Sequence, residues 1–306
     1  MVRNFLFHRV NPERDLLWDP MEVAHFDRCI RYISDKYKVI LLEDYTSDPR
    51  LFLNDEVATI CFDDGYKDNI EFAAPILDRY HCPASFYVVT DCIDHNKPTW
   101  THMLEYVFQY TNRKETDLNF NFLPASLRIT HLDDKKARLE YAKKLKPYLK
   151  TIAHEQRNAV LEKIQSIYTD VVLPELMMNW DDLRQLRNAG HYIGSHTVSH
   201  CMLGTMGDEA EVKYELETSR QVINKQLGYL PGTISYPVGS YNENTKRLSR
   251  EAGYKIGLAV KQTVYNPHED DIFEIPRIEL YNEPWWKTKM RISNRLEEIK
   301  QLIGYK

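Results

Sequence analysis

Histidine and aspartate residues carry the clearest chemical signals in the sequence. His196 and His200 are four positions apart, so both imidazoles can bind one metal ion if Thr197 begins a helical turn. Taken alone, the pair is better explained as two ordinary histidines in a polar loop. Its position directly after a strand-like segment that ends in Gly194-Ser195 favours the metal site.

Two adjacent aspartates, Asp63 and Asp64, follow a buried-type apolar run and precede Gly65. Adjacent residues of an extended chain point to opposite sides. The two carboxylates therefore cannot face each other as a glycosidase pair without a sharp turn. They can divide the work, one binding an ion and the other facing the reacting atoms. Without further context, an ordinary Asp-Asp-Gly turn after a strand explains them better.

The composition limits the class of protein. The 306 residues are 43% hydrophobic and 28% charged, as in a soluble globular protein. The net charge of −5 does not indicate the excess of positive charge that binding to nucleic acid requires. No apolar window is long enough to span a membrane. The N-terminal residues lack the features of a secretory signal, and the five cysteines form no C-x-x-C pair. We therefore expect a cytoplasmic protein with reduced thiols; its oligomeric state stays open.

Strand and helix signals alternate along most of the chain. Helices are expected to begin at Asp19-Pro20 and at residue 285, and to cover residues 179–190, 208–228 and 242–253. Strands are expected at residues 4–10, 38–42, 57–62, 84–90, 191–195, 233–236, 254–260 and 272–275. This alternation predicts an α/β fold, a distorted barrel of seven or eight βα units with a mostly parallel sheet. Residues 1–306 are predicted to form a single domain, with a helical insertion at about residues 96–176.

In βα barrels the functional residues lie at the carboxyl ends of the strands. The expected strands end at His8, at Asp63-Asp64, at His196 and at Pro237-Val238-Gly239. All of these ends should meet at one mouth, and three of them carry residues that can bind a metal or transfer a proton.

Three segments, taken together and in this order, resemble the polysaccharide deacetylases of carbohydrate esterase family 4: residues 59–66 (TICFDDGY), 195–200 (SHTVSH) and 235–239 (SYPVG). The resemblance covers roughly residues 4–95 and 176–280. It implies a distorted β/α barrel, Asp63 as general base, and Asp64, His196 and His200 as ligands of one divalent metal. Zn²⁺ is the default ion, with Co²⁺ or Ni²⁺ as alternatives.

The sequence departs from the family pattern at two places. Ser235 stands where the family has an arginine that orients the catalytic aspartate, and we predict that Arg277 supplies this guanidinium from the last strand. The usual C-terminal Leu-x-His motif is also missing. His8, within Leu6-Phe7-His8, resembles the N-terminal histidine of permuted members such as the poly-N-acetylglucosamine deacetylases, which implies that His8 is the general acid.

Four further residues are expected at the substrate side of this site. Backbone N–H groups around Val238 should hold the developing oxyanion, with Tyr236 and Pro237 beside them. Trp180 recurs in the family just before the helix that precedes the histidine motif. We interpret it as a packing residue or as a wall of the site.

The predicted function is a metal-dependent amide hydrolase that removes an N-acetyl group from an amino sugar, alone or in an oligo- or polysaccharide. A carbohydrate is thus the expected partner, with no nucleic acid and no membrane span. One alternative is a two-histidine, one-carboxylate Fe(II) oxygenase. It is disfavoured because such triads usually lie on β-sandwich folds. The other is a carbohydrate-binding or partner-scaffolding module that kept the fold and lost catalysis; Ser235 is its best support.

Overall fold

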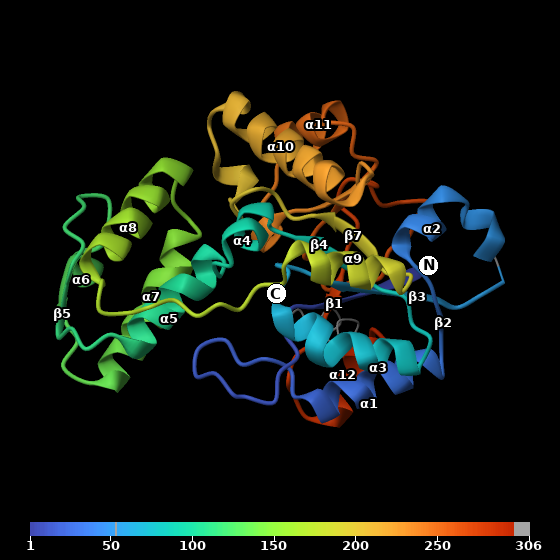
Figure 1. Ribbon diagram of the computed structural model, residues 1–306, viewed down its shortest axis with the longest axis horizontal. Helices are drawn as coiled ribbons and strands as arrows, with labels where there is room; N and C mark the ends of the chain where they lie inside the picture. The colour runs from blue at the N-terminus through green and yellow to red at the C-terminus, as the bar shows by residue number, and fades with distance from the viewer. Residues whose placement is uncertain (53, 297–306) are drawn as a thin grey trace.

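The computed structural model describes residues 1–52 and 54–296, and a curled, mostly parallel sheet forms its centre (Figure 1). Neighbouring strands along the sheet are β10 (Ile278–Glu279), β1 (Val2–Phe7), β3 (Val57–Phe62), β4 (Ser85–Val88), β7 (Tyr192–Ser195), β8 (Thr233–Ser235) and β9 (Ile256–Leu258). The short β2 (Lys38–Val39) also pairs with β3. The α/β class and the distorted barrel predicted from the sequence are confirmed.

Helices cover both sides of this sheet (Figure 1). One group comprises α10 (Glu209–Leu227) and α11 (Glu243–Glu251), and the other comprises α1 (Val23–Ser34), α3 (Ala74–Arg79) and α12 (Trp285–Ile292), while α9 (Trp180–Asn188) precedes β7. Every residue of β3 is buried, as expected for a parallel strand covered on both faces. Phe62 stacks between Phe7 and Phe86 at centroid distances of 5.4 and 4.9 Å. These stacked rings connect the adjacent strands β1, β3 and β4.

The two ends of the sheet meet through residues 275–279. Ile275 forms a parallel bridge with Leu258 of β9, and Ile278 pairs with Phe5 of β1. The predicted strand at residues 272–275 is therefore wrong in position, because β10 begins at Ile278. Pro276, which has no N–H to donate, lies where the segment leaves β9 and joins β1.

Two other expected elements differ from the structure. No helix begins at Asp19-Pro20: Met21 donates its N–H to the carbonyl of Arg9, which holds this part of the loop extended, and α1 begins at Val23. The strand predicted at residues 38–42 ends at Val39, because α2 (Leu42–Ser47) begins three residues later. Acidic residues in the first turn of α2 suit the positive end of a helix dipole.

The inserted segment packs around a hydrophobic cluster of its own, to one side of the barrel (Figure 1). It contains α5 (Trp100–Tyr110), α6 (Ala125–Arg128), α7 (Lys135–Leu149), α8 (His154–Ile167) and two short antiparallel strands, β5 (Glu115–Asp117) and β6 (Ile129–His131). A single domain with an insertion at residues 96–176 stays a prediction. Within the described residues no helix has the length and apolar character needed to cross a membrane, and the cytoplasmic location also stays a prediction.

Candidate metal centre and active-site cleft

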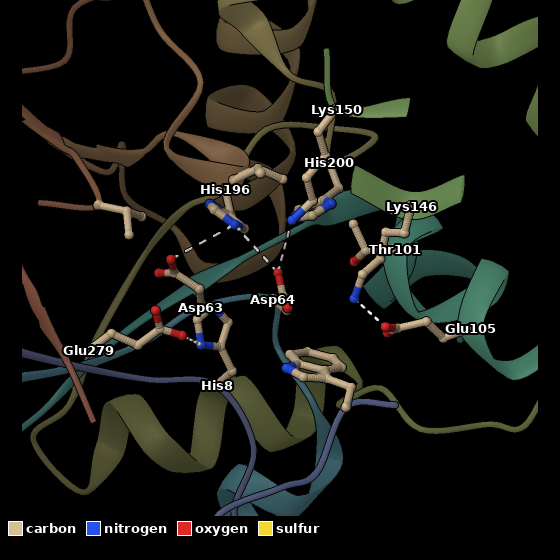
Figure 2. Close-up of a pocket in the computed structure, with 13 residues that line it drawn as sticks. His8, Asp63, Asp64, Thr101, Glu105, Lys146, Lys150, His196, His200 and Glu279 are labelled. Carbon is tan, nitrogen blue, oxygen red and sulfur yellow. Dashed lines mark hydrogen bonds and ion pairs between the residues drawn. The ribbon is translucent and has the colours of Figure 1, made fainter. Parts of the chain in front are cut away.

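A cleft of about 200 Å³ lies at the carboxyl ends of the central strands (Figure 2). His8 follows β1, Asp63 and Asp64 follow β3, His196 follows β7, and all four line the cleft. Parallel strands bring their carboxyl ends to the same edge, so residues far apart in the sequence meet here. The structure thus brings together most of the residues that the sequence singled out.

Asp64, His196 and His200 form a compact group of metal-binding side chains. Their potential ligand atoms all lie within 4.8 Å of one another, and all three residues are buried. Oδ1 of Asp64 lies 3.4 Å from Nε2 of His196 and 3.2 Å from Nε2 of His200. This oxygen nevertheless has no hydrogen bond of acceptable geometry. Three ligand atoms that converge without bonding to one another fit a divalent cation at their centre.

The electrostatics of Asp64 agree with this interpretation. Burial alone would raise the pKa of its carboxyl group, but His200 and His196 outweigh burial and hold the pKa well below its usual value. Asp64 is therefore ionised at neutral pH, which is the state that binds a metal.

Left-handed backbone conformations shape both metal-binding loops. Gly65 donates its N–H to the carbonyl of Asp63 at 3.0 Å, which closes a sharp turn around Asp64 with its φ of 76°. Thr197 and His200 have φ values of 70° and 59°, so the helical turn considered at Thr197 does not form, and a left-handed loop brings the two imidazoles together instead. Non-glycine residues at positive φ are strained, and such strain is often found at functional sites.

Hydrogen bonds from two helices hold the histidine loop in this shape. Glu215 of α10 accepts the N–H groups of Val198 and Ser199 at 2.8 and 3.0 Å. Trp100 of α5 donates its indole N–H to the carbonyl of His200 at 3.0 Å. The inserted segment thus takes part in positioning one of the candidate ligands.

The orientation of His196 is fixed by a second bond behind the ring. Its Nδ1 lies 2.8 Å from the carbonyl oxygen of Ser235, which can only accept a hydrogen bond. Nδ1 is therefore the protonated nitrogen, and Nε2 is left free to bind a cation.

Asp63 forms a buried, bidentate pair with Arg277. Nη1 and Nη2 of Arg277 donate to Oδ1 and Oδ2 of Asp63 at 2.8 and 2.9 Å. Oγ of Ser235 lies 3.0 Å from both Nη2 of Arg277 and Oδ2 of Asp63, so it accepts from one and donates to the other. Burial would raise the pKa of Asp63, but Arg277 outweighs it and the pKa is lowered. The guanidinium expected from Arg277 thus contacts Asp63, and its part in catalysis stays a prediction.

His8 lies in the cleft beside two residues that the sequence did not single out. Its Nδ1 is 3.4 Å from Oε1 of Glu279, and its ring packs edge to face on Trp18 at 5.7 Å. Glu279 comes two residues after Arg277, so a period of two along the last strand places both on one face. That signal was available in the sequence, whereas Trp18 lies in a loop without a recognisable pattern.

The structure places three of the expected substrate-side residues elsewhere. Tyr236 and Pro237 are buried and do not line the cleft, whereas Val238, with a φ of 59°, does. Tyr236 follows Ser235 along the chain and therefore points away from the cleft side, into the core. Trp180 donates its indole N–H to Asp94 at 2.7 Å and packs on the main core. Trp180 is thus found as a packing residue, which was one of the two interpretations given for it.

A protein-family model described as polysaccharide deacetylase matches residues 53–116 and 132–257, which is more than half of the chain. The chain belongs to the polysaccharide deacetylase family. The matched residues include Asp63, Asp64, His196, His200 and Ser235. His8 and Arg277 lie outside the match, so their assignment depends on the geometry described above.

Solved structures of two deacetylases share the fold. The deacetylase PplD of Streptococcus pyogenes, determined with acetate, has a TM-score of 0.61 at 16% identity, and the match covers 97% of this chain and 96% of that one. A de-N-acetylase from Aggregatibacter actinomycetemcomitans has a TM-score of 0.63 at 15% identity, covering 95% and 99%.

Curated relatives are similar over shorter stretches. The peptidoglycan-N-acetylglucosamine deacetylase of Bacillus cereus is 30% identical over 74 residues, or 24% of this chain and 26% of that protein. The Bacillus subtilis family protein YxkH is 27% identical over 81 residues, or 26% and 29%. The chain thus matches less than a third of the length of these relatives.

Proposed function

We propose that this deacetylase-family chain is a metal-dependent hydrolase that removes the N-acetyl group from an amino sugar, alone or within an oligo- or polysaccharide. One observation carries the proposal: the metal-binding group of Asp64, His196 and His200 shares a cleft with a carboxylate, Asp63, that is held in place from behind by Arg277. A metal site next to an oriented base is the arrangement that amide hydrolysis needs.

The bound ion would be Zn²⁺ by default, and it would polarise the acetyl carbonyl and lower the pKa of a water molecule in the cleft. Asp63, ionised and fixed through both oxygens, accepts the proton of that water as it attacks. Ser235 and Arg277 keep the carboxylate from turning away from the cleft. The backbone N–H of Val238 is the proposed donor to the oxygen that becomes negative.

The amine of the sugar leaves only if it receives a proton, because it is too basic to depart as an anion. His8 is the proposed donor. It lies in the same cleft as Asp63, and its Nδ1 is 3.4 Å from Oε1 of Glu279. Trp18 packs edge to face against the same ring.

The alternatives are less well supported by the site. A binding module without catalysis was favoured by Ser235, but Arg277 supplies the missing guanidinium to Asp63. An Fe(II) oxygenase would use the same three ligands, but the curled parallel sheet is not the β-sandwich on which such triads usually lie.

The test is acetate release from a panel of N-acetylated sugars, after chelation and then with Zn²⁺, Co²⁺ or Ni²⁺ added back. The panel includes peptidoglycan fragments, because the Bacillus cereus relative is named for that substrate. We expect release that chelation abolishes and metal restores. Tight sugar binding without acetate release under any metal would support the binding module instead.

A further inference from the structure

One wall of the cleft is built by the inserted segment, from two pairs of side chains at helical spacing (Figure 2). Thr101 and Glu105 are four residues apart on α5, and Lys146 and Lys150 are four residues apart at the end of α7. Residues at this spacing lie on the same face of a helix. Both helices thus present their polar pair to the cleft that holds Asp63 and the metal-binding group.

The charges on this wall do not cancel. Lys146 forms an ion pair with Glu105, marked by a dashed line in Figure 2. Across residues 1–52 and 54–296, no ion pair or hydrogen bond is found for the ammonium group of Lys150. The wall therefore carries one uncompensated positive charge.

The acidic residues of the cleft do not need Lys150 as a counter-charge. Asp63 is paired with Arg277, and Glu279 lies beside His8. Asp64 faces the two histidines that complete the metal-binding group. Burial lowers the pKa of Lys150, with Lys146 adding to this effect, so holding its charge in the cleft is unfavourable without a partner.

One carboxylate oxygen of Glu105 also lacks a hydrogen-bond donor, although the other oxygen is paired with Lys146. The residue is only 5% exposed and lines the cleft, and its Oε2 accepts no hydrogen bond from any described residue. A buried acceptor that stays unpaired is destabilising, so a ligand that donates to it gains affinity. A sugar hydroxyl is such a donor, and it suits an acceptor whose charge is already opposed by Lys146.

We propose that the wall formed by Thr101, Glu105, Lys146 and Lys150 binds an acidic saccharide. Lys150 binds a carboxylate or phosphate on, or next to, the N-acetylated sugar, and Glu105 accepts a hydroxyl of the same ligand. The inference rests on the proposed function and narrows its substrate from any N-acetylated sugar to one that carries a negative charge.

Two matched pairs of substrates test this proposal and separate the two sources of negative charge. In the carboxylate arm, a disaccharide of N-acetylglucosamine and glucuronic acid is compared with the same disaccharide carrying glucose. In the phosphate arm, N-acetylglucosamine 1-phosphate is compared with the methyl glycoside of N-acetylglucosamine. For each pair, kcat/KM for acetate release is measured with wild type, Lys150→Gln, Lys150→Arg and Lys143→Gln. Lys143 is an exposed lysine of the same helix and serves as the control.

Wild type should prefer the acidic member of at least one pair. Lys150→Gln should reduce that preference by about tenfold to a hundredfold, the range for a hydrogen bond between charged groups. Lys150→Arg should keep most of the preference, Lys143→Gln all of it, and added salt should weaken it in wild type. Equal rates for both members of each pair, or equal losses for both in Lys150→Gln, would overturn the proposal.

Failure of this inference can be told apart from failure of the proposed function. If neutral sugars release acetate and Lys150→Gln does not change kcat/KM for either member of a pair, the proposed hydrolase activity is retained and the acidic substrate is rejected. If no sugar releases acetate, calorimetric binding of the same pairs decides. If the acidic member binds and Lys150→Gln weakens this binding, the proposal of an acidic ligand is retained and the proposal of a hydrolase is rejected.

Discussion

Replacing Arg277 by methionine should destabilise the protein strongly, because it leaves the Asp63 carboxylate buried without its counter-charge. Arg277 is fully buried, and its guanidinium donates to both oxygens of Asp63, to Ser235 and to the carbonyl of Ala259. Methionine keeps much of the apolar volume and removes every one of these donors. The rate of catalysis should fall as well, because Asp63 would lose the partner that fixes its orientation.

The expected magnitude follows from the burial of both partners. Removing one member of a buried ion pair costs about 3–5 kcal/mol, because the remaining charge is uncompensated. An exposed pair is worth about 0–1 kcal/mol. Arg247 provides the matched control, because it also forms ion pairs with two carboxylates, Glu209 and Glu251, but at an exposed position. Arg247→Met should therefore leave the free energy of unfolding almost unchanged, because solvent screens this exposed pair.

The assay is urea unfolding at pH 7, monitored by tryptophan fluorescence. A chelator is present so that metal binding does not add to the stability. Arg277→Met, Asp63→Asn and the double variant complete a thermodynamic cycle. The double variant should lose about 2–3 kcal/mol less than the sum of the single losses, because the pair is removed as a unit. Arg277→Lys, which keeps the charge but not the bidentate geometry, should fall between wild type and Arg277→Met.

Additive losses in the cycle would refute this reasoning, since they would mean that Asp63 and Arg277 do not depend on each other. An Arg277→Met protein within about 1 kcal/mol of wild type would refute it too, because the Asp63 charge would then be tolerated without its partner. If Arg277→Met does not fold, Arg277→Lys and Asp63→Asn still test the pair through their separate losses.

Four further outcomes are expected. His200→Ala should lose the near-stoichiometric metal that elemental analysis finds in wild type, and wild type that binds no added metal would contradict this. Asp63→Asn should keep the metal and lose activity by about 10²–10⁴-fold, so retained turnover would reassign the base. His8→Ala should keep the metal and lose the basic limb of the pH–rate profile; an unchanged profile would point to another acid. Burial lowers the pKa of His102 to about 4, from an ordinary value of 6.5. The contribution of His102 to the free energy of unfolding should therefore fall by about 3 kcal/mol as the pH drops from 6.5 through 4. In urea titrations over this pH range, His102→Gln should show a smaller fall than wild type.

The core of the candidate site could be predicted because it depends on local sequence and one topological rule. Asp64 and His196 lie just after the strands β3 and β7, and the carboxyl ends of parallel strands share an edge. His8 could be placed by the same rule, since Phe7 pairs with Phe62 directly before the two aspartates.

Other parts of the site could not be predicted because they depend on tertiary contacts. The spacing of Lys146 and Lys150 is the same as that of any solvent-facing pair on a helix. Only the docking of the insertion, through Trp100 to the carbonyl of His200, turns them toward the cleft. The left-handed conformation of Thr197 is likewise stabilised by surrounding contacts and opposes its intrinsic preference.

The closure of the sheet by residues 275–279 has a consequence for how the protein is made. Asn4 of the first strand donates to the carbonyl of Pro276, 272 positions later. During synthesis the first strand therefore lacks one of its neighbours until nearly all described residues have left the ribosome. Contacts of such long range slow folding and leave strand edges open to aggregation in the meantime. The same late segment delivers Arg277 and Glu279, so barrel closure and assembly of the active site should be a single event in folding.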